Sequence, residues 1–308
     1  MTDAWLKHGQ IFDPASRRSH PKLLTHAANP LPIRIEGDIY RCFYSSRDAQ
    51  QRSSVGAVDI DVKKRRVVRE FNEPFFTHGN EETFYSDGVS IGNCYVADGT
   101  QYMLFMGWKN PPDSHWRGEI GRLIVTPEFT LELESTNPFI GLNEDDPISL
   151  SYPWVHTNSA TEFHMWFGST QSWDAGNGEM LHTIEHATSA DGHHWTRTQH
   201  AIPSETGIAQ AFSRPTVLKT QAGNYRMWFS YRCGTGRTYR IGHARSNDAT
   251  TWRLQLDETC IPTSSAGWDS EMVEYPFVFE HERRTYMLYN GNGYGKTGFG
   301  LAELQASC

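Results

Sequence analysis

A repeat of about 60 residues limits the folds open to this 308-residue chain more than any other feature of its sequence. Aligned on a proline, three clear copies read SYPWVHTNSATEFHMWFGS, SRPTVLKTQAGNYRMWFSY and EYPFVFEHERRTYMLYNG. Two weaker copies precede them, ANPLPIRIEGDIYRCFYSS and SDGVSIGNCYVADGTQYMLFMG. The aligned positions, called anchors below, are 58, 65, 62 and 61 residues apart, at Pro30, Gly88, Pro153, Pro215 and Pro276. Self-similarity at such a spacing indicates one supersecondary unit used five times.

Each copy predicts a meander of antiparallel strands. A short strand starts at the anchor, a polar turn such as Glu-Gly-Asp follows, and an aromatic-rich alternating strand such as YRMWFSY comes next. Alternation between turn signals is typical of strands. Most copies contain a third strand, and two of these end in a Ser-x-Asp-x-x-x-Trp hairpin, at Ser189, Asp191, Trp195 and at Ser246, Asp248, Trp252. We expect these hairpins to be structural, because Asp and Ser side chains accept turn amides.

Sheets of three or four strands repeated at this spacing predict an all-β chain that folds as a single five-bladed β-propeller, one domain over residues 1–308. The inner strands are expected to start near 30, 88, 153, 215 and 276. The last copy ends near Leu304 and has room for only three strands. We therefore expect the N-terminal segment, from Trp5 to Phe12, to supply the missing outer strand and close the ring, which removes an exposed sheet edge.

The composition argues against several classes of function. A formal net charge of −8 argues against a nucleic-acid partner, because phosphate binding requires a basic face. No apolar run is long enough to span a bilayer, and the start, MTDAWLKHGQIFDP, lacks a signal-peptide pattern. We predict a cytoplasmic protein without a membrane partner, a cofactor or a metal; a secreted form that has lost its signal stays open. The five cysteines follow no disulfide or zinc spacing and are predicted to be reduced thiols, at Cys42, Cys94, Cys233, Cys260 and Cys308.

The repeat also predicts where side chains converge. In a propeller the inner strands line a central channel, and their starts lie at one end of it. The residues directly before the anchors are therefore expected to meet at the channel mouth: Asn29, Asp87, Tyr152, Arg214 and Tyr275. Glu274 lies two residues before its anchor and is expected to join them.

At the level of repeat and architecture, the whole chain resembles the five-bladed β-propeller glycosidase superfamily, which includes arabinanases and xylosidases, invertases and levansucrases, and mannoside phosphorylases. Four short motifs carry the resemblance: Asp87-Gly88, Ser213-Arg214-Pro215, Glu274-Tyr275-Pro276 and the hairpin at 189–195. The resemblance implies a carbohydrate-active enzyme that cleaves or transfers a glycosidic bond with paired carboxylates. It implies Glu274 as the general acid, which must stay protonated near neutral pH, and Asp87 as the base or nucleophile. It implies that Arg214 holds a carboxylate, an anomeric oxygen or phosphate.

One departure from the family pattern keeps the reaction type open. The hydrolases that the chain resembles generally carry an acidic residue at the start of the first inner strand, where this sequence has Asn29. One alternative is a sugar phosphorylase or transglycosylase, in which Arg214 holds inorganic phosphate, with Lys296 as a second candidate. The other is a non-catalytic propeller that binds a glycan.

Further residues are predicted to shape a sugar pocket. These substrate-binding candidates are Arg214, Asn29, His26, Tyr152, Tyr275 and the loop tryptophans Trp108 and Trp173, which would stack on sugar faces. The structural alternatives stay beside them: solvated loop residues for Glu274, Asp87 and His26, a salt-bridge partner for Arg214, and core packing for the tryptophans.

Overall fold

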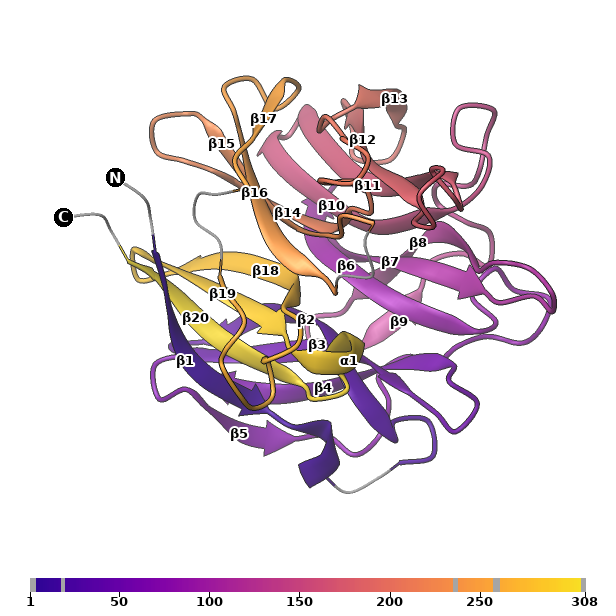
Figure 1. Cartoon of the computed structure of the whole chain (residues 1–308). Coiled ribbons are helices and arrows are strands. Elements are labelled where there is room, and N and C mark those ends of the chain that lie inside the picture. The colour runs from indigo at the N-terminus through magenta and orange to yellow at the C-terminus, as the bar shows by residue number, and fades with distance from the viewer. Residues whose placement is uncertain (1–3, 18–19, 235–237, 257–260, 306–308) are drawn as a thin grey trace.

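The computed structural model describes residues 4–17, 20–234, 238–256 and 261–305, and these fold almost entirely into β-strands (Figure 1). The helical pieces within these ranges are a 3-10 turn, η1 (Pro14–Ser16), and one short turn, α1 (Asn292–Gly295). Neither of them has the length or the apolar character needed to cross a membrane. The predicted all-β class is confirmed.

The strands form five units of four antiparallel strands each. Unit 1 contains β2 (Thr25–Glu36), β3 (Ile39–Arg47), β4 (Ser53–Asp61) and β5 (Arg66–Glu70). Unit 2 contains β6 (Gly88–Ala97), β7 (Thr100–Lys109), β8 (Arg117–Val125) and β9 (Leu131–Leu133). Unit 3 contains β10 (Leu150–Ser159), β11 (Glu162–Ser172), β12 (Leu181–Ser189) and β13 (Thr196–His200). Unit 4 contains β14 (Ser213–Lys219), β15 (Tyr225–Tyr231), β16 (Arg240–Ser246) and β17 (Trp252–Leu254). Unit 5 contains β18 (Glu274–His281), β19 (Arg284–Asn290), β20 (Phe299–Gln305) and β1 (Ala4–Phe12). Units 1 and 2 share one sheet through a single parallel pair, Ser53 with Gly88.

The aromatic middle strands are buried on both faces of their sheets. In β15, Tyr225, Met227 and Phe229 belong to the largest apolar cluster of the chain. Trp228, which points to the opposite face, belongs to a separate cluster with Val278 of unit 5. The sheet of unit 4 is therefore packed on both faces, which explains why β15 has apolar residues at successive positions, Met227, Trp228 and Phe229.

A left-handed backbone residue occurs at the same repeat position in four of the five units. The residue directly before the anchor has a positive φ at Asn29 (57°), Tyr152 (37°), Arg214 (48°) and Tyr275 (50°). The first strand of each of these units shifts register at this place, as in a β-bulge. Side chains such as Tyr and Arg adopt this conformation at a cost, and such strain is common at ligand sites. Asp87, the corresponding residue of unit 2, precedes β6 and has no positive φ.

Hydrogen bonds connect each unit to the next one along the chain. They run from Ile91 N to Ser45 Oγ (3.3 Å), from Asn93 Nδ2 to Val155 O (2.8 Å), from Tyr225 OH to Asn158 Oδ1 (3.0 Å) and from Tyr275 N to Ser230 Oγ (2.7 Å). Unit 5 in turn contacts unit 1, because Asn29 N donates to Asn290 Oδ1 at 2.9 Å. In Figure 1 the yellow strands of unit 5 accordingly lie beside the indigo and purple strands of unit 1.

The N-terminal strand is the fourth strand of unit 5. β1 pairs antiparallel with β20, from Ala4 opposite Gln305 to Phe12 opposite Phe299. Lys7 Nζ lies 2.7 Å from Asp269 Oδ2, a carboxylate in the loop that leads to β18. The prediction that the segment from Trp5 to Phe12 supplies the missing strand is confirmed.

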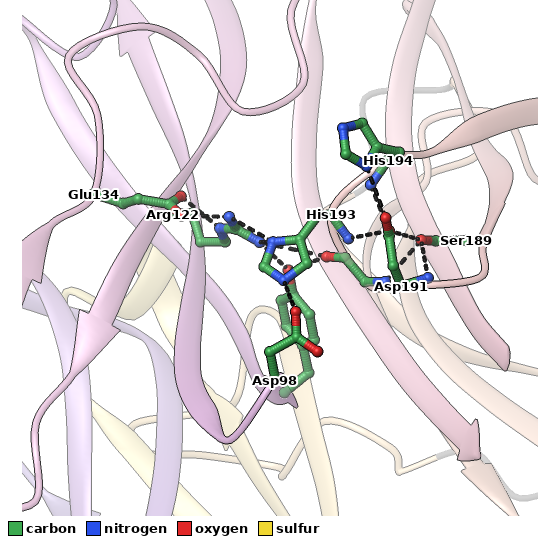
Figure 2. A network of polar contacts seen from close by, with 9 residues as sticks. Asp98, Arg122, Glu134, Ser189, Asp191, His193 and His194 are labelled. Carbon is green, nitrogen blue, oxygen red and sulfur yellow. Dashed lines mark hydrogen bonds and ion pairs between the residues drawn. The ribbon is translucent and has the colours of Figure 1, made fainter. Parts of the chain in front are cut away.

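The hairpin at 189–195 has the structural role that the sequence predicts (Figure 2). Asp191 Oδ1 accepts the backbone amides of His193 and His194, both at 2.8 Å. Ser189 Oγ accepts a third turn amide at 2.8 Å. The hairpin at 246–252 repeats this pattern of side chain to turn amide bonds.

Arg122 of β8 joins this hairpin to unit 2, as Figure 2 shows. Its guanidinium pairs with the carboxylate of Glu134 and donates to the hydroxyl of Tyr95 at 2.8 Å. It also donates to His193 Nδ1 at 3.2 Å and lies 3.9 Å from the centre of the Tyr102 ring. Only a planar fork of donors can make these bonds and stack on a ring at the same time.

Arg122→Lys is therefore expected to lower the free energy of unfolding by roughly 1–3 kcal/mol, since lysine keeps the charge but loses the fork. Urea unfolding measures the change. Arg117→Lys, at an exposed position of the same strand, is the matched control and should stay within about 0.5 kcal/mol of wild type. Equal stability of the two variants would show that the network contributes nothing.

Cys42 and Cys94 are free thiols. Burial, followed by the nearby Asp59 carboxylate, raises the pKa of Cys42 well above its ordinary value. Cys260 and Cys308 lie outside the described residues, so the prediction of reduced thiols is untested there.

Candidate functional site

A cavity of about 460 Å³ lies at the starts of the first strands, within the size range of small-molecule sites. All five units contribute to its wall, for example through Asn29, Trp108, Tyr152, Arg232 and Tyr275. The convergence that the repeat predicts at this end of the strands thus coincides with a cavity.

Four of the predicted pocket residues line this cavity: Asn29, Tyr152, Tyr275 and Trp108. The Tyr152 and Tyr275 rings lie 5.3 Å apart, and their hydroxyls are 3.3 Å apart. The indole of Trp108 donates to Ser53 Oγ at 3.2 Å. It packs so closely on Gly88 that a Cβ at that anchor would lie 2.4 Å from the ring, so the glycine is required there.

Glu274, the predicted general acid, is fully buried next to the cavity wall and is not one of its lining residues. Neither carboxyl oxygen has a hydrogen-bond partner of ordinary geometry among the described residues. Burial raises the pKa of Glu274 well above its ordinary value; the charge of Arg232, the backbone amide of Tyr294 and the charge of Arg47 act in the opposite direction. Burial therefore favours the protonated form of this carboxyl group.

Asp87, the predicted base or nucleophile, is half-buried and does not line the cavity either. Its Oδ2 accepts the backbone amide of Asn110 at 2.8 Å. Its own amide donates to Trp108 O at 3.1 Å, so the residue borders two lining residues of β7 and the loop after it.

Arg214, the predicted anion clamp, is buried among backbone carbonyls. Its two terminal nitrogens donate to Ile91 O at 2.5 Å and to Pro30 O at 2.9 Å, in units 2 and 1. Burial lowers the pKa of Arg214 to about 9, with the phenols of Tyr152 and Tyr275 acting in the opposite direction. These contacts place the side chain across the middle of the molecule, where it links three units, rather than in the cavity wall.

His26, Trp173 and Lys296 lie outside the cavity lining. His26 is buried beside the α1 turn, and burial, followed by the charges of Arg47 and Lys296, lowers its pKa to about 4. Trp173 stacks on His115 at 4.4 Å and meets the edge of Trp116, which does line the cavity. Trp173 can therefore act on a ligand through Trp116.

The sequence prediction missed two arginines that line the cavity, Arg47 and Arg232. Each of them follows a serine by two residues, Ser45 and Ser230. These serines pair with Ala28 and Ser213, which each lie two residues before an anchor. The signal was present as a shared Ser-x-Arg in FYSSR and WFSYR at the end of the second strand. Aligning the ends of the second strands, as well as the starts of the first, would have found both.

Several polar groups of the cavity wall have unusual surroundings. Asn29 Oδ1 and Ser213 Oγ are buried without a hydrogen-bond partner in the described part of the chain. His182 Nε2 lies 2.6 Å from Ser151 Oγ, and burial lowers the pKa of His182 to about 3, so this imidazole is neutral. Buried polar atoms generally have partners, and unpaired ones in a cavity wall suit the hydroxyl groups of a ligand.

One group of side chains has ligand atoms close enough together for a metal, Asp38, His281 and Glu282, away from the cavity. Both ring nitrogens of His281 are already in contact with other groups, Tyr40 OH at 3.0 Å and Asp38 Oδ1 at 2.9 Å. We interpret the group as a structural contact between units 1 and 5.

The fold is shared with carbohydrate-active proteins of known structure. A protein described as a glycoside hydrolase aligns over 99% of this chain and 93% of its own, with a TM-score of 0.75 and 12% identity. A structure reported for the GH130 family of mannoside phosphorylases aligns over 98% and 94%, with a TM-score of 0.72 and 13% identity. An endo-arabinase from Bacteroides thetaiotaomicron aligns over 98% of both chains, with a TM-score of 0.65 and 11% identity. The TM-scores show that this chain shares its fold with these proteins, and identities this low leave its activity open.

No family model matches the sequence. Two curated proteins of Mycobacterium tuberculosis, Rv1502 of strain H37Rv and MT1551 of strain CDC 1551, are both described as uncharacterized. Each is 41% identical over 304 residues, which cover 98% of this chain and 99% of the relative. The chain belongs to the same protein family as Rv1502 and MT1551.

Proposed function

We propose that the five units are the blades of a single five-bladed propeller over residues 1–308, with the ring closed by β1. The contacts from unit 5 back to unit 1, through Asn290 and Asn29, support a ring. Arg214 supports it as well, because it reaches from unit 4 to units 1 and 2 across the middle.

We propose further that the protein is a carbohydrate-active enzyme that binds a sugar in the cavity and cleaves or transfers its glycosidic bond. The observation that carries this proposal is Glu274, a fully buried carboxyl group kept protonated by burial and placed behind the cavity wall. It lies close enough to the phenols of Tyr239, Tyr275 and Tyr152, all of which line the cavity, for their ionisation to be coupled to its own. A protonated carboxyl group beside a sugar site has the property needed to protonate a leaving oxygen.

Asp87 is proposed as the base or nucleophile, since it borders the same wall from unit 2. Phosphorolysis is the alternative reaction. In that case we assign the phosphate to the lining arginines Arg47 and Arg232 rather than to Arg214, whose terminal nitrogens already donate to carbonyls. One structural neighbour belongs to a family whose printed description includes both mannoside phosphorylases and glycoside hydrolases, so this fold is compatible with both reactions.

The experiment that tests the function is product release from a panel of furanosides and pyranosides, with and without inorganic phosphate. Turnover without phosphate would identify a hydrolase or transglycosylase, and turnover that requires phosphate would identify a phosphorylase. Saturable binding of a panel member without any product would contradict the enzymatic proposal.

That last outcome would support the second candidate, a non-catalytic glycan-binding propeller. One observation favours it: neither Glu274 nor Asp87 lines the cavity.

For an enzyme and for a binding protein alike, Trp108→Ala is expected to weaken sugar binding about tenfold, since it removes a lining aromatic surface. Trp173→Ala is the matched control, with a smaller loss expected because Trp173 acts only through Trp116. Titration of tryptophan fluorescence measures both, and unchanged affinity in Trp108→Ala would place the sugar elsewhere.

A further inference from the structure

The charge of the cavity wall differs from that of the whole chain. The protein carries a formal net charge of −8. Among the described residues that line the cavity there is no Asp, Glu or Lys, and the charged ones are Arg47 and Arg232. Burial raises the pKa of Glu274, a buried acid behind the wall, which favours its neutral form. The cavity is therefore a positively charged site in an acidic protein.

The two arginines differ in how their charge is balanced. Arg232 Nη2 forms an ion pair with Glu179 Oε1 at 2.7 Å, and the guanidinium lies 4.7 Å from the centre of the Tyr239 ring. Arg47 is half-buried, and the one described hydrogen bond of its guanidinium, to Gln51 Oε1, is 3.5 Å long. That length is well beyond the usual distance for a charged donor.

The other two arginines of unit 1 that are buried or partly buried have carboxylate partners. Arg41 pairs with Asp59 at 2.9 Å, and Arg52 pairs with Asp48 at 2.9 Å. In the described part of the chain no carboxylate lies within ion-pair distance of Arg47. A guanidinium that lines a cavity without a partner is a fitting receptor for a planar or tetrahedral anion.

A role for Arg47 in tuning Glu274 explains its position less well than a role in binding a ligand. Its charge acts on Glu274 so as to favour the ionised carboxylate, which opposes the protonated state that a general acid needs. An anion bound to Arg47 would cancel this influence and leave burial to keep Glu274 protonated. A bound anionic ligand would thus neutralise Arg47 and favour the protonated form of Glu274 that the proposed reaction needs.

We propose that the cavity takes a negatively charged sugar, one that carries a carboxylate or a phosphate ester, and that the anionic group binds the guanidinium of Arg47. This inference rests on the proposed function of the cavity as a sugar site. Asn29 Oδ1 and Ser213 Oγ, both unpartnered in the same wall, are assigned to the neutral hydroxyl groups of that sugar.

The test compares charged sugars with their neutral parents by calorimetry and by tryptophan fluorescence. The probes are the methyl glycosides of glucuronate and galacturonate, the 6-phosphates of methyl glucoside and methyl galactoside, the neutral methyl glycosides, and inorganic phosphate alone. At least one charged sugar is expected to bind about ten- to a hundredfold more tightly than its neutral parent, the range for a hydrogen-bonded charge. The carboxylate and phosphate arms distinguish the two sources of charge.

Arg47→Gln is expected to abolish this preference, so that the charged sugars bind no more tightly than their neutral parents. Arg66→Gln, at an exposed position of β5 in the same unit, should keep the preference in full. If Arg47→Gln does not fold, the salt dependence of wild-type binding replaces it: charged probes should lose affinity between 0.05 and 0.5 M salt, roughly the range over which screening grows strong, and neutral probes should not.

Three outcomes would overturn the proposal in different ways. Equal affinity for charged and neutral sugars, or a preference that survives Arg47→Gln, would sink this inference and leave the proposed function intact. Tight binding of inorganic phosphate, with no gain from charge on the sugar, would assign the arginine to a separate phosphate and favour phosphorolysis. Failure of every sugar to bind would overturn the inference and the proposed function together.

Discussion

Glu274→Gln is expected to lower kcat/KM by a factor of about 10²–10⁴ on the substrate that the panel identifies, the usual contribution of a general acid. Glutamine has nearly the same shape as a protonated glutamic acid, so the cavity wall should be unchanged and KM should change little. The loss should be smallest on aryl glycosides whose leaving group needs no proton. It should be largest on alkyl glycosides, because departure of an alkoxide depends on protonation.

The pH dependence of the reaction gives a second check on Glu274. Burial raises the pKa of this carboxyl group, so the active protonated form persists towards neutral pH, and activity should fall on the alkaline side as the group ionises. That alkaline limb should be absent from the residual activity of Glu274→Gln, since an amide does not titrate there.

A matched control for Glu274 lies on the same strand. Glu280 is exposed near the end of β18, away from the cavity lining, and Glu280→Gln should keep wild-type activity. Urea unfolding should show that Glu274→Gln is about as stable as wild type, because the substitution exchanges one neutral buried polar group for another of nearly the same shape. Full turnover of alkyl glycosides by the glutamine variant would rule Glu274 out as the acid.

The repeat made the strand order and the convergence of side chains predictable from the sequence. Pairing within each unit follows from turns and alternation, which are local features. The role of Trp5–Phe12 follows from a count of strands, since the last copy lacks a fourth. Asn29, Tyr152 and Tyr275 were found because equivalent positions of a repeat occupy equivalent places.

The repeat did not determine the direction in which each side chain points. Tyr152, Arg214 and Tyr275 share the same position and the same left-handed backbone, yet the two tyrosines line the cavity while Arg214 donates to the carbonyls of Pro30 and Ile91. Its direction depends on acceptors in units 1 and 2, which are distant in sequence. Such long-range partners leave no local pattern.

Burial at the site was also beyond the reach of the sequence. Glu274 in EYPFVF is preceded by a polar loop, so its exposure could not be inferred from hydrophobic patterning. In the structure the backbone of Tyr294 in the α1 turn and the phenols of Tyr239 and Tyr275 lie close to this buried carboxyl group. The property that would make it an acid thus comes from tertiary packing rather than from the motif.

The second large effect expected is acid unfolding that begins well above the titration range of ordinary carboxylates. Burial lowers the pKa of His182 and His243 to about 3, and that of His186 and His26 to about 4. Unfolded histidine has a pKa of about 6.5, so between about pH 6.5 and pH 4 the unfolded chain binds protons that the native chain does not. Stability is complete above this window and is lost as the pH falls through it.

Glu274 opposes this trend, since its raised pKa lets the native state bind a proton that the unfolded chain releases above about pH 4.5. On unfolding in this window the four histidines take up about four protons and Glu274 releases about one. The net uptake of about three protons corresponds to a change in the free energy of unfolding of roughly 4 kcal/mol per pH unit. Because domains are commonly stable by about 5–15 kcal/mol, we expect cooperative unfolding between about pH 6 and pH 4.

Urea unfolding at a series of pH values from about 8 to about 4.5, which covers most of this window, measures the slope. His243→Gln should make the slope shallower by about 1.4 kcal/mol per pH unit, because it removes one of the four protons taken up on unfolding. His194→Gln is the control: this side chain is almost fully exposed and its loss should leave the slope unchanged. Stability that stays flat between pH 7 and pH 5 would mean that the buried imidazoles acquire their protons without unfolding, through water that reaches them in the native state.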